Sequence, residues 1–227
     1  MAANPAYAGS RGAIGLNYFG RAQWSGIGGA PTTNSISIDG STLDGRFGLG
    51  MQMYHDHIGV YNNNVINFMF SSRVKVSDEG VLSGGIQIGM KNSQINLTNV
   101  KNVYDLNDYK FQQNVNEWNP TLGGGVFYNT DKFYLGVSVP NILSSANIYS
   151  GVGKTNDYHM FIATGYVFDI DEDIKLKPST LLKLASGAPA EFDLNANVWY
   201  KNMFGIGASL RTGDAYVGMA EVQLTRQ

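Results

Sequence analysis

The tripeptide His55-Asp56-His57 is the arrangement in this chain best suited to bind a metal ion. Residues i and i+2 of a strand point to the same side, so the two imidazoles would share a face, and imidazole is a common zinc ligand. However, the tripeptide ends an alternating segment and runs into a loop, where polar residues are ordinary. We therefore predict a polar strand end here, and we expect the chain to use no metal and no cofactor.

A hydrolytic enzyme would need a Ser or Thr nucleophile next to a His base. The third histidine, His159, lies in another alternating segment, and no G-x-S-x-G motif opens a helix in this sequence. Ser10 has neither the preceding strand nor the following helix that such a motif requires. The chain contains no cysteine, which excludes a thiolate nucleophile and a disulfide framework. We predict that the protein is not an enzyme and has no catalytic residues.

The composition excludes several other classes of protein. The chain has 227 residues, a formal net charge of −2 and 15% charged residues, which is unlike a nucleic-acid-binding domain. It has no apolar run of about 18 residues, so we expect no transmembrane helix. Asn4 follows Met1-Ala2-Ala3 directly, and we expect any signal peptide to have been removed. Since no linker divides the chain, we predict one domain over residues 1–227.

Apolar and polar residues alternate with a period of two along most of the chain, which is typical of half-buried strands. The alternation is broken by Gly, Asn and Asp residues, and helical periodicity is nearly absent. The alternation with a period of two defines twelve segments. They are residues 13–24, 32–39, 45–55, 64–76, 80–91, 121–129, 132–139, 157–168, 173–184, 190–200, 203–211 and 215–226.

The alternation fits a soluble sandwich or a membrane barrel whose apolar face meets lipid. The connections between segments favour the barrel, because long and short ones alternate. The third connection, residues 55–63, and the fifth, residues 92–120, are among those we predict to be long. We predict an all-β, transmembrane, antiparallel up-and-down barrel whose short turns are periplasmic. Closure of the barrel would leave no exposed strand edge.

Several charged residues fall on the polar, inward side of the alternation. We predict that they form an internal ion-pair network, and a selective pore lining is the alternative. They are Arg73, Lys75, Lys91, Lys175, Lys177, Lys183, Asp193, Arg211 and Glu221.

Aromatic and aliphatic residues occur within the two longest connections, where exposed aromatic side chains are typical of interfaces. We predict that these residues form a partner-binding surface. They are Tyr104, Tyr109, Phe111, Trp118, Ile142, Leu143, Ile148 and Tyr149.

Motifs spread along the whole chain are collinear with those of one known family. NPAYAG at residues 4–9 precedes the first segment, R-x-Q-W-x-G begins at Arg21, and GAP-x-T occupies residues 29–33. DKFYLG-x-S-x-PN follows at residues 131–141, and R-T-G-D follows at residues 211–214. In these motifs the chain resembles the PorP/SprF family of Bacteroidetes outer-membrane proteins, which belong to the type IX secretion and gliding machinery.

The resemblance implies a barrel of fourteen strands, against the twelve segments visible here. It also implies a non-enzymatic role in the cell outer membrane, helping to secrete or anchor a surface adhesin that carries a type IX terminal domain. Periplasmic or peptidoglycan-linked secretion components and the lipid bilayer are the other expected partners. A passive outer-membrane channel is the alternative function, and a soluble β-sandwich binding module is a third.

The opening motif itself carries no group suited to catalysis. We predict that it is a structural lead-in packed at the periplasmic rim of the barrel, where small residues allow close approach. A docking epitope for a periplasmic partner is the alternative. The residues concerned are Asn4, Pro5, Tyr7 and Gly9.

Overall fold

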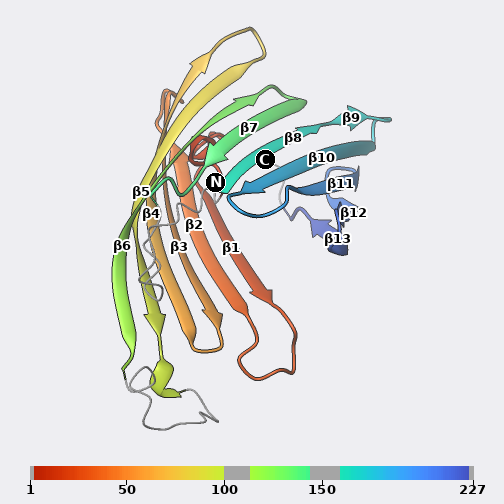
Figure 1. Ribbon diagram of the computed structural model, residues 1–227. Coiled ribbons are helices and arrows are strands. Elements are labelled where there is room, and N and C mark those ends of the chain that lie inside the picture. The colour runs from red at the N-terminus through yellow and green to blue at the C-terminus, as the bar shows by residue number, and fades with distance from the viewer. Residues whose placement is uncertain (1–2, 100–112, 144–158, 225–227) are drawn as a thin grey trace.

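The computed structural model describes residues 3–99, 113–143 and 159–224, and shows one strongly curved antiparallel sheet (Figure 1). Along the main path each strand pairs with the next in sequence, as the up-and-down prediction requires. The first seven strands are β1 (Gly15–Ala22), β2 (Thr32–Ser41), β3 (Phe47–Ile58), β4 (Tyr61–Lys75), β5 (Val81–Ile95), β6 (Val115–Asn129) and β7 (Phe133–Val139). The others are β8 (His159–Tyr166), β9 (Phe168–Asp169), β10 (Ile174–Ala185), β11 (Glu191–Tyr200), β12 (Phe204–Arg211) and β13 (Ala215–Val222).

The helical content of the described residues is two short 3-10 turns, η1 (Pro5–Tyr7) and η2 (Leu97–Asn99). No helix in these residues has the length and apolar character needed to cross a membrane.

Each of the twelve predicted segments overlaps one strand of the main path, so the period-two interpretation is confirmed. The additional strand, β9, is only two residues long and pairs with β10. The strands on either side of the fifth connection extend further than predicted, to Ile95 and from Val115, so this connection is shorter than residues 92–120.

The prediction of a long third connection is wrong. Ile58 pairs with Tyr61, and only Gly59 and Val60 join β3 to β4. Gly59 has φ +60°, a left-handed conformation that glycine adopts without strain. The polar residues on both sides of this turn belong to strands because strand pairing uses the backbone, and their side chains can remain in water.

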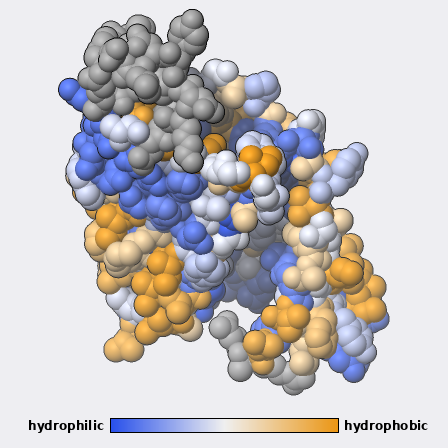
Figure 2. Space-filling view, turned by 90° about the horizontal axis from the view of Figure 1, so that it is seen from below, coloured by the Kyte–Doolittle hydropathy of each residue, from blue (hydrophilic) through white to orange (hydrophobic). Residues whose placement is uncertain are grey.

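The two faces of the sheet have opposite character. On β4 the outward side chains of Phe68 and Phe70 are 52% and 43% exposed, whereas the inward Asn67 and Ser71 are 4% and 0% exposed. Figure 2 shows hydrophobic residues gathered on the outer margins and hydrophilic residues across the middle. An extensive exposed apolar face with a polar interior is the arrangement of a sheet that faces lipid.

The predicted closure is not observed within the described part of the chain. There β1 pairs only with β2, and β13 pairs only with β12. The sheet is therefore open between these two strands, and their outer backbone groups have no strand partner. The prediction inferred closure from the need to satisfy backbone groups in lipid, but a sequence pattern does not determine how far a sheet curves.

Placing a charge on the outward face should destabilise the protein in a bilayer. Ile86 lies midway along the outward row of β5 between Leu82 and Met90, and is 59% exposed. We expect Ile86→Arg to lower the free energy of unfolding in phosphatidylcholine vesicles by about 2–4 kcal/mol, the cost of Arg near the bilayer midplane. Guanidinium unfolding followed by tryptophan fluorescence measures this change.

Leu43→Arg is the matched control, because Leu43 lies in the turn between β2 and β3 with an exposed fraction of 111%. We expect this variant to unfold like the unmodified protein. Equal stability of both variants would contradict a lipid-facing role for the outward face.

Candidate functional site

The lead-in segment, residues 4–9, forms a compact turn before the first strand. The Asn4 side chain caps η1, because its Oδ1 accepts a hydrogen bond from the Ala6 amide at 2.9 Å. Pro5 occupies the first position of η1, where its missing N–H costs nothing. Gly9 ends the segment with φ +68°. The sequence Asn-Pro-x-x-x-Gly therefore specifies this turn locally.

The segment lies in the hollow of the sheet, against the polar inward face (Figure 1). Asn4 Nδ2 donates to the Val126 carbonyl at 2.9 Å, and Ser71 Oγ donates to the Ala8 carbonyl at 2.7 Å. The side chains of Ala6 and Ala8 are completely buried. The segment thus connects strands that are far apart in the sequence.

Inward glycines on the strands make room for this backbone. A Cβ on Gly85 would lie 2.3 Å from the Ala6 nitrogen, and one on Gly48 would lie 2.0 Å from the Ala8 oxygen. A Cβ on Gly125 would lie 2.4 Å from Asn4 Oδ1. Sequence analysis did not find these three positions. The available signal was glycine at inward positions of otherwise regular strands, which marks close backbone approach.

A buried carboxylate holds the end of the segment. Asp39 on β2 accepts from the Gly9 amide at 2.8 Å and from Arg11 Nη2 at 2.7 Å. Its side chain is completely buried, so both hydrogen bonds offset the cost of removing the charge from water. Arg73 Nη2 adds a hydrogen bond to the Ala8 carbonyl at 3.1 Å.

The four predicted lead-in residues lie on the inward face, on the side of the sheet nearer the short turns. Tyr7 packs edge-on against Phe127 of β6, with ring centroids 5.2 Å apart. Pro5 is buried, and Asn4 and Gly9 make the hydrogen bonds described above. All four contribute to packing inside the sheet.

Several of the predicted inward charges form an ion-pair cluster on β10, β11 and β12. Arg211 Nε lies 2.7 Å from Asp193 Oδ1, and Lys183 Nζ lies 2.8 Å from Asp193 Oδ2. Glu191, which sequence analysis missed, pairs with both cations. The cluster therefore links neighbouring strands through alternating charges.

Other predicted inward charges have individual partners. Lys177 lies over the Tyr134 ring at 5.9 Å, and Glu221 accepts from Asn197 at 3.0 Å. In the turn after β6, Lys132 donates to Asp169 at 2.8 Å, which raises the pKa of Lys132.

Five residues of the predicted partner-binding surface lie outside the described residues. They are Tyr104, Tyr109, Phe111, Ile148 and Tyr149. Trp118 lies on β6 and not in a loop, and it is 62% exposed on the outward face. Ile142 and Leu143 lie in the connection after β7, beyond Pro140 and Asn141, and are also exposed.

The two histidines of the first tripeptide lie on the outward face of β3, whereas Asp56 points inward. His55 Nδ1 pairs with Asn64 Oδ1 at 2.7 Å, and His57 Nδ1 pairs with Asn62 Oδ1 at 2.8 Å. Thr33 Oγ1 donates to Asp56. Within residues 3–99, 113–143 and 159–224, no cluster of three or more His, Cys, Asp or Glu side chains could hold a metal ion.

A side chain at Gly85 should displace the lead-in segment. We expect Gly85→Val to raise the rate of trypsin cleavage after Arg11 at least about tenfold, the effect of losing roughly 1.4 kcal/mol of docking free energy. Mass spectrometry of timed digests measures the cleavage. Gly84→Val is the matched control, because a Cβ on Gly84 would meet no atom within 4 Å. Equal cleavage in both variants would show that the segment does not depend on this contact.

Comparison with known proteins gives one family match. The family model described as "Type IX secretion system membrane protein PorP/SprF" matches residues 1–227, the whole chain. No curated protein and no solved structure gives a significant match. The matched family consists of secretion-system membrane proteins and is not a family of enzymes. A location in a membrane agrees with the apolar outer face and the polar interior of the sheet. The chain therefore belongs to the PorP/SprF family and is a membrane component of the type IX secretion system.

Proposed function

We propose that this protein is a non-enzymatic outer-membrane component that helps to secrete or anchors a surface adhesin through the connections at one end of the sheet. Residues 1–227 act as one domain in this proposal. The adhesin, which carries a type IX terminal domain, binds on the outside, and other secretion components bind on the periplasmic side. The match of the whole chain to a secretion-system family is the observation that carries this proposal.

The contents of the sheet's interior favour anchoring over conduction. The lead-in segment contacts β4, β5 and β6 on the inward face. The Ser71 side chain of β4 donates to its Ala8 carbonyl, and its Asn4 side chain donates to the Val126 carbonyl of β6. The ion-pair cluster on β10 to β12 joins cations to carboxylates and so neutralises charge that could attract a permeating ion. These groups support the strands and leave the loops as the surface for a partner.

The connections at the two ends of the sheet suggest how it is oriented. The described residues between β2 and β3, β4 and β5, and β6 and β7 form short turns, as periplasmic turns do. The connections after β5 and β7 are much longer and leave the opposite end of the sheet. These connections contain Tyr104, Tyr109, Phe111, Ile142, Leu143, Ile148 and Tyr149. We assign these residues, with Trp118, to the outside surface that binds the adhesin.

A passive channel is the second candidate. It is favoured by a cavity of about 450 Å³ on the inward face, lined by Gln52, Asn67, Gln87 and other polar and aromatic side chains. Such a lining could solvate a small solute if the cavity continued through the molecule.

Purification from native membranes in mild detergent tests the proposal. We expect a large surface protein to co-purify with the full-length protein and to be identified by mass spectrometry. Replacing residues 100–112 with Gly and Ser at constant length should reduce its recovery at least about fivefold, the effect of losing roughly 1 kcal/mol of binding free energy. The matched control replaces residues 186–190, which join β10 to β11 and are mostly small, and it should retain the partner.

Two outcomes would contradict anchoring. One is equal recovery of the partner by both loop variants. The other is a protein that purifies alone and conducts ions in a planar bilayer, which would establish the channel instead.

A further inference from the structure

The outward face of β2 to β6 changes from apolar to polar along one line that crosses all five strands. The last apolar row, in register, is Ile36, Met53, Ile66, Met90 and Pro120. The next outward row is Asn34, His55, Asn64, Asn92 and Trp118, and the one after it is Thr32, His57, Asn62, Gln94 and Asn116. A change at the same register position on five strands indicates a boundary between two solvents.

The apolar rows between this line and the short turns extend over about the thickness of the hydrocarbon core of a bilayer. On β4 they run from Val74 to Ile66, a span of eight residues. At about 3.3 Å per residue and a tilt of about 40°, this corresponds to roughly 20 Å, close to the apolar band of membrane barrels. The line therefore lies at the depth of the lipid headgroups, on the side of the longer connections.

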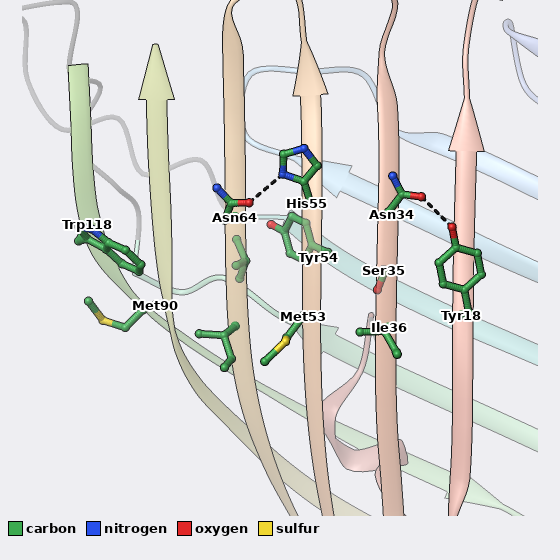
Figure 3. A pocket seen from close by; sticks show the side chains of 12 residues that line it. Tyr18, Asn34, Ser35, Ile36, Met53, Tyr54, His55, Asn64, Met90 and Trp118 are labelled. Atoms are coloured by element: carbon green, nitrogen blue, oxygen red, sulfur yellow. Dashed lines mark hydrogen bonds between the residues drawn. The ribbon is translucent and has the colours of Figure 1, made fainter. Parts of the chain in front are cut away.

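A groove of about 480 Å³ crosses this line (Figure 3). Ile36, Met53 and Met90 form its apolar part, and they are 47%, 43% and 39% exposed. Asn34, His55 and Asn64 lie on the polar side of the groove, and Trp118 borders it on β6. One part of the groove is thus suited to an acyl chain and the other to a polar headgroup.

The polar part of the groove is ordered and has unused hydrogen-bonding groups. The Tyr18 hydroxyl donates to Asn34 Oδ1 at 2.8 Å, and His55 Nδ1 pairs with Asn64 Oδ1 at 2.7 Å. Among the described residues, the Nδ2 groups of Asn34 and Asn64 donate to no protein atom. These carboxamides are held in place while their N–H groups remain available to a ligand.

The groove contains no charged side chain. The two polar rows contain only Asn, His, Thr, Gln and Trp. The charged residues nearest in sequence occupy alternate positions that face inward, namely Arg21, Asp56, Lys91 and Glu117. Phosphate headgroups are bound by Arg and Lys, which donate charge-assisted hydrogen bonds. Amides and an exposed tryptophan instead match the hydroxyl groups and apolar ring faces of a neutral sugar.

We propose that this groove binds a neutral glycolipid of the membrane leaflet on the side of the longer connections. Its sugar hydroxyls accept hydrogen bonds from Asn64, and its ring lies against Trp118. Its acyl chain covers Ile36, Met53 and Ile66. This lipid site shares Trp118 with the adhesin-binding surface proposed above, but its other residues lie on β2, β3 and β4, and its lipid preference can be measured without the adhesin.

Quenching of Trp118 fluorescence tests the proposal. Trp24→Phe and Trp199→Phe leave Trp118 as the only tryptophan of the full chain. The protein is placed in phosphatidylcholine nanodiscs that contain a small fraction of lipid with brominated acyl chains. The brominated lipid is galactosyl diacylglycerol, phosphatidylcholine or phosphatidylglycerol. We expect galactosyl diacylglycerol to be enriched at Trp118 at least about tenfold over phosphatidylcholine, a difference of roughly 1.4 kcal/mol.

Asn64→Ala should abolish this enrichment, whereas the matched control Asn63→Ala should retain it. Asn63 is the neighbouring residue on β4 but points inward, where it accepts from Ser93 Oγ at 2.9 Å. Far-UV circular dichroism establishes that both variants are folded. Three results would overturn the proposal: no preference for galactosyl diacylglycerol, stronger enrichment of phosphatidylglycerol, or no quenching of Trp118 by any brominated chain.

Discussion

The structure depends on one constraint: each strand presents apolar side chains outward and polar side chains inward. On a soluble protein the apolar face would pack into a core, but here residues such as Phe68 and Ile86 remain exposed. The hydrophobic effect therefore stabilises this sheet only when lipid covers the outward face. The interior must then be held together by hydrogen bonds and ion pairs, because it has few apolar side chains to bury.

The lead-in segment shows how such an interior is filled. Its backbone supplies the Ala8 carbonyl to Ser71 and the Gly9 amide to Asp39, and its Asn4 side chain donates to the Val126 carbonyl. These three partners lie on three different strands. Glycines on the strands allow this backbone to approach closely, as at Gly85. At the other side of the sheet the cluster around Asp193 fills a similar role with charged side chains. Hydrogen bonds and ion pairs of this kind hold the strands of the interior in a fixed arrangement.

The outward face is also not uniformly apolar. A uniform apolar surface would interact with any lipid, but the row of Asn34, His55 and Asn64 adds directional hydrogen bonds at one depth. Neutral polar groups at that depth distinguish lipid headgroups by their hydrogen-bonding groups and not by their charge. Membrane placement and lipid selection then arise from the same change in strand sequence.

The strands, their alternation and their up-and-down order could be predicted from the amino-acid sequence, because the period of two is a local property of each segment. The sequence also determined the family, through motifs such as NPAYAG at residues 4–9. The three-dimensional structure was needed to show that the β3–β4 connection is a two-residue turn and that Glu191 joins the ion-pair cluster. It was also needed to show that β1 and β13 do not pair within the described residues. Likewise, only the register of five strands brought Asn34, His55 and Asn64 into one row. These features depend on contacts between residues far apart in the chain, and local alternation does not specify how strands are aligned or how strongly a sheet curves.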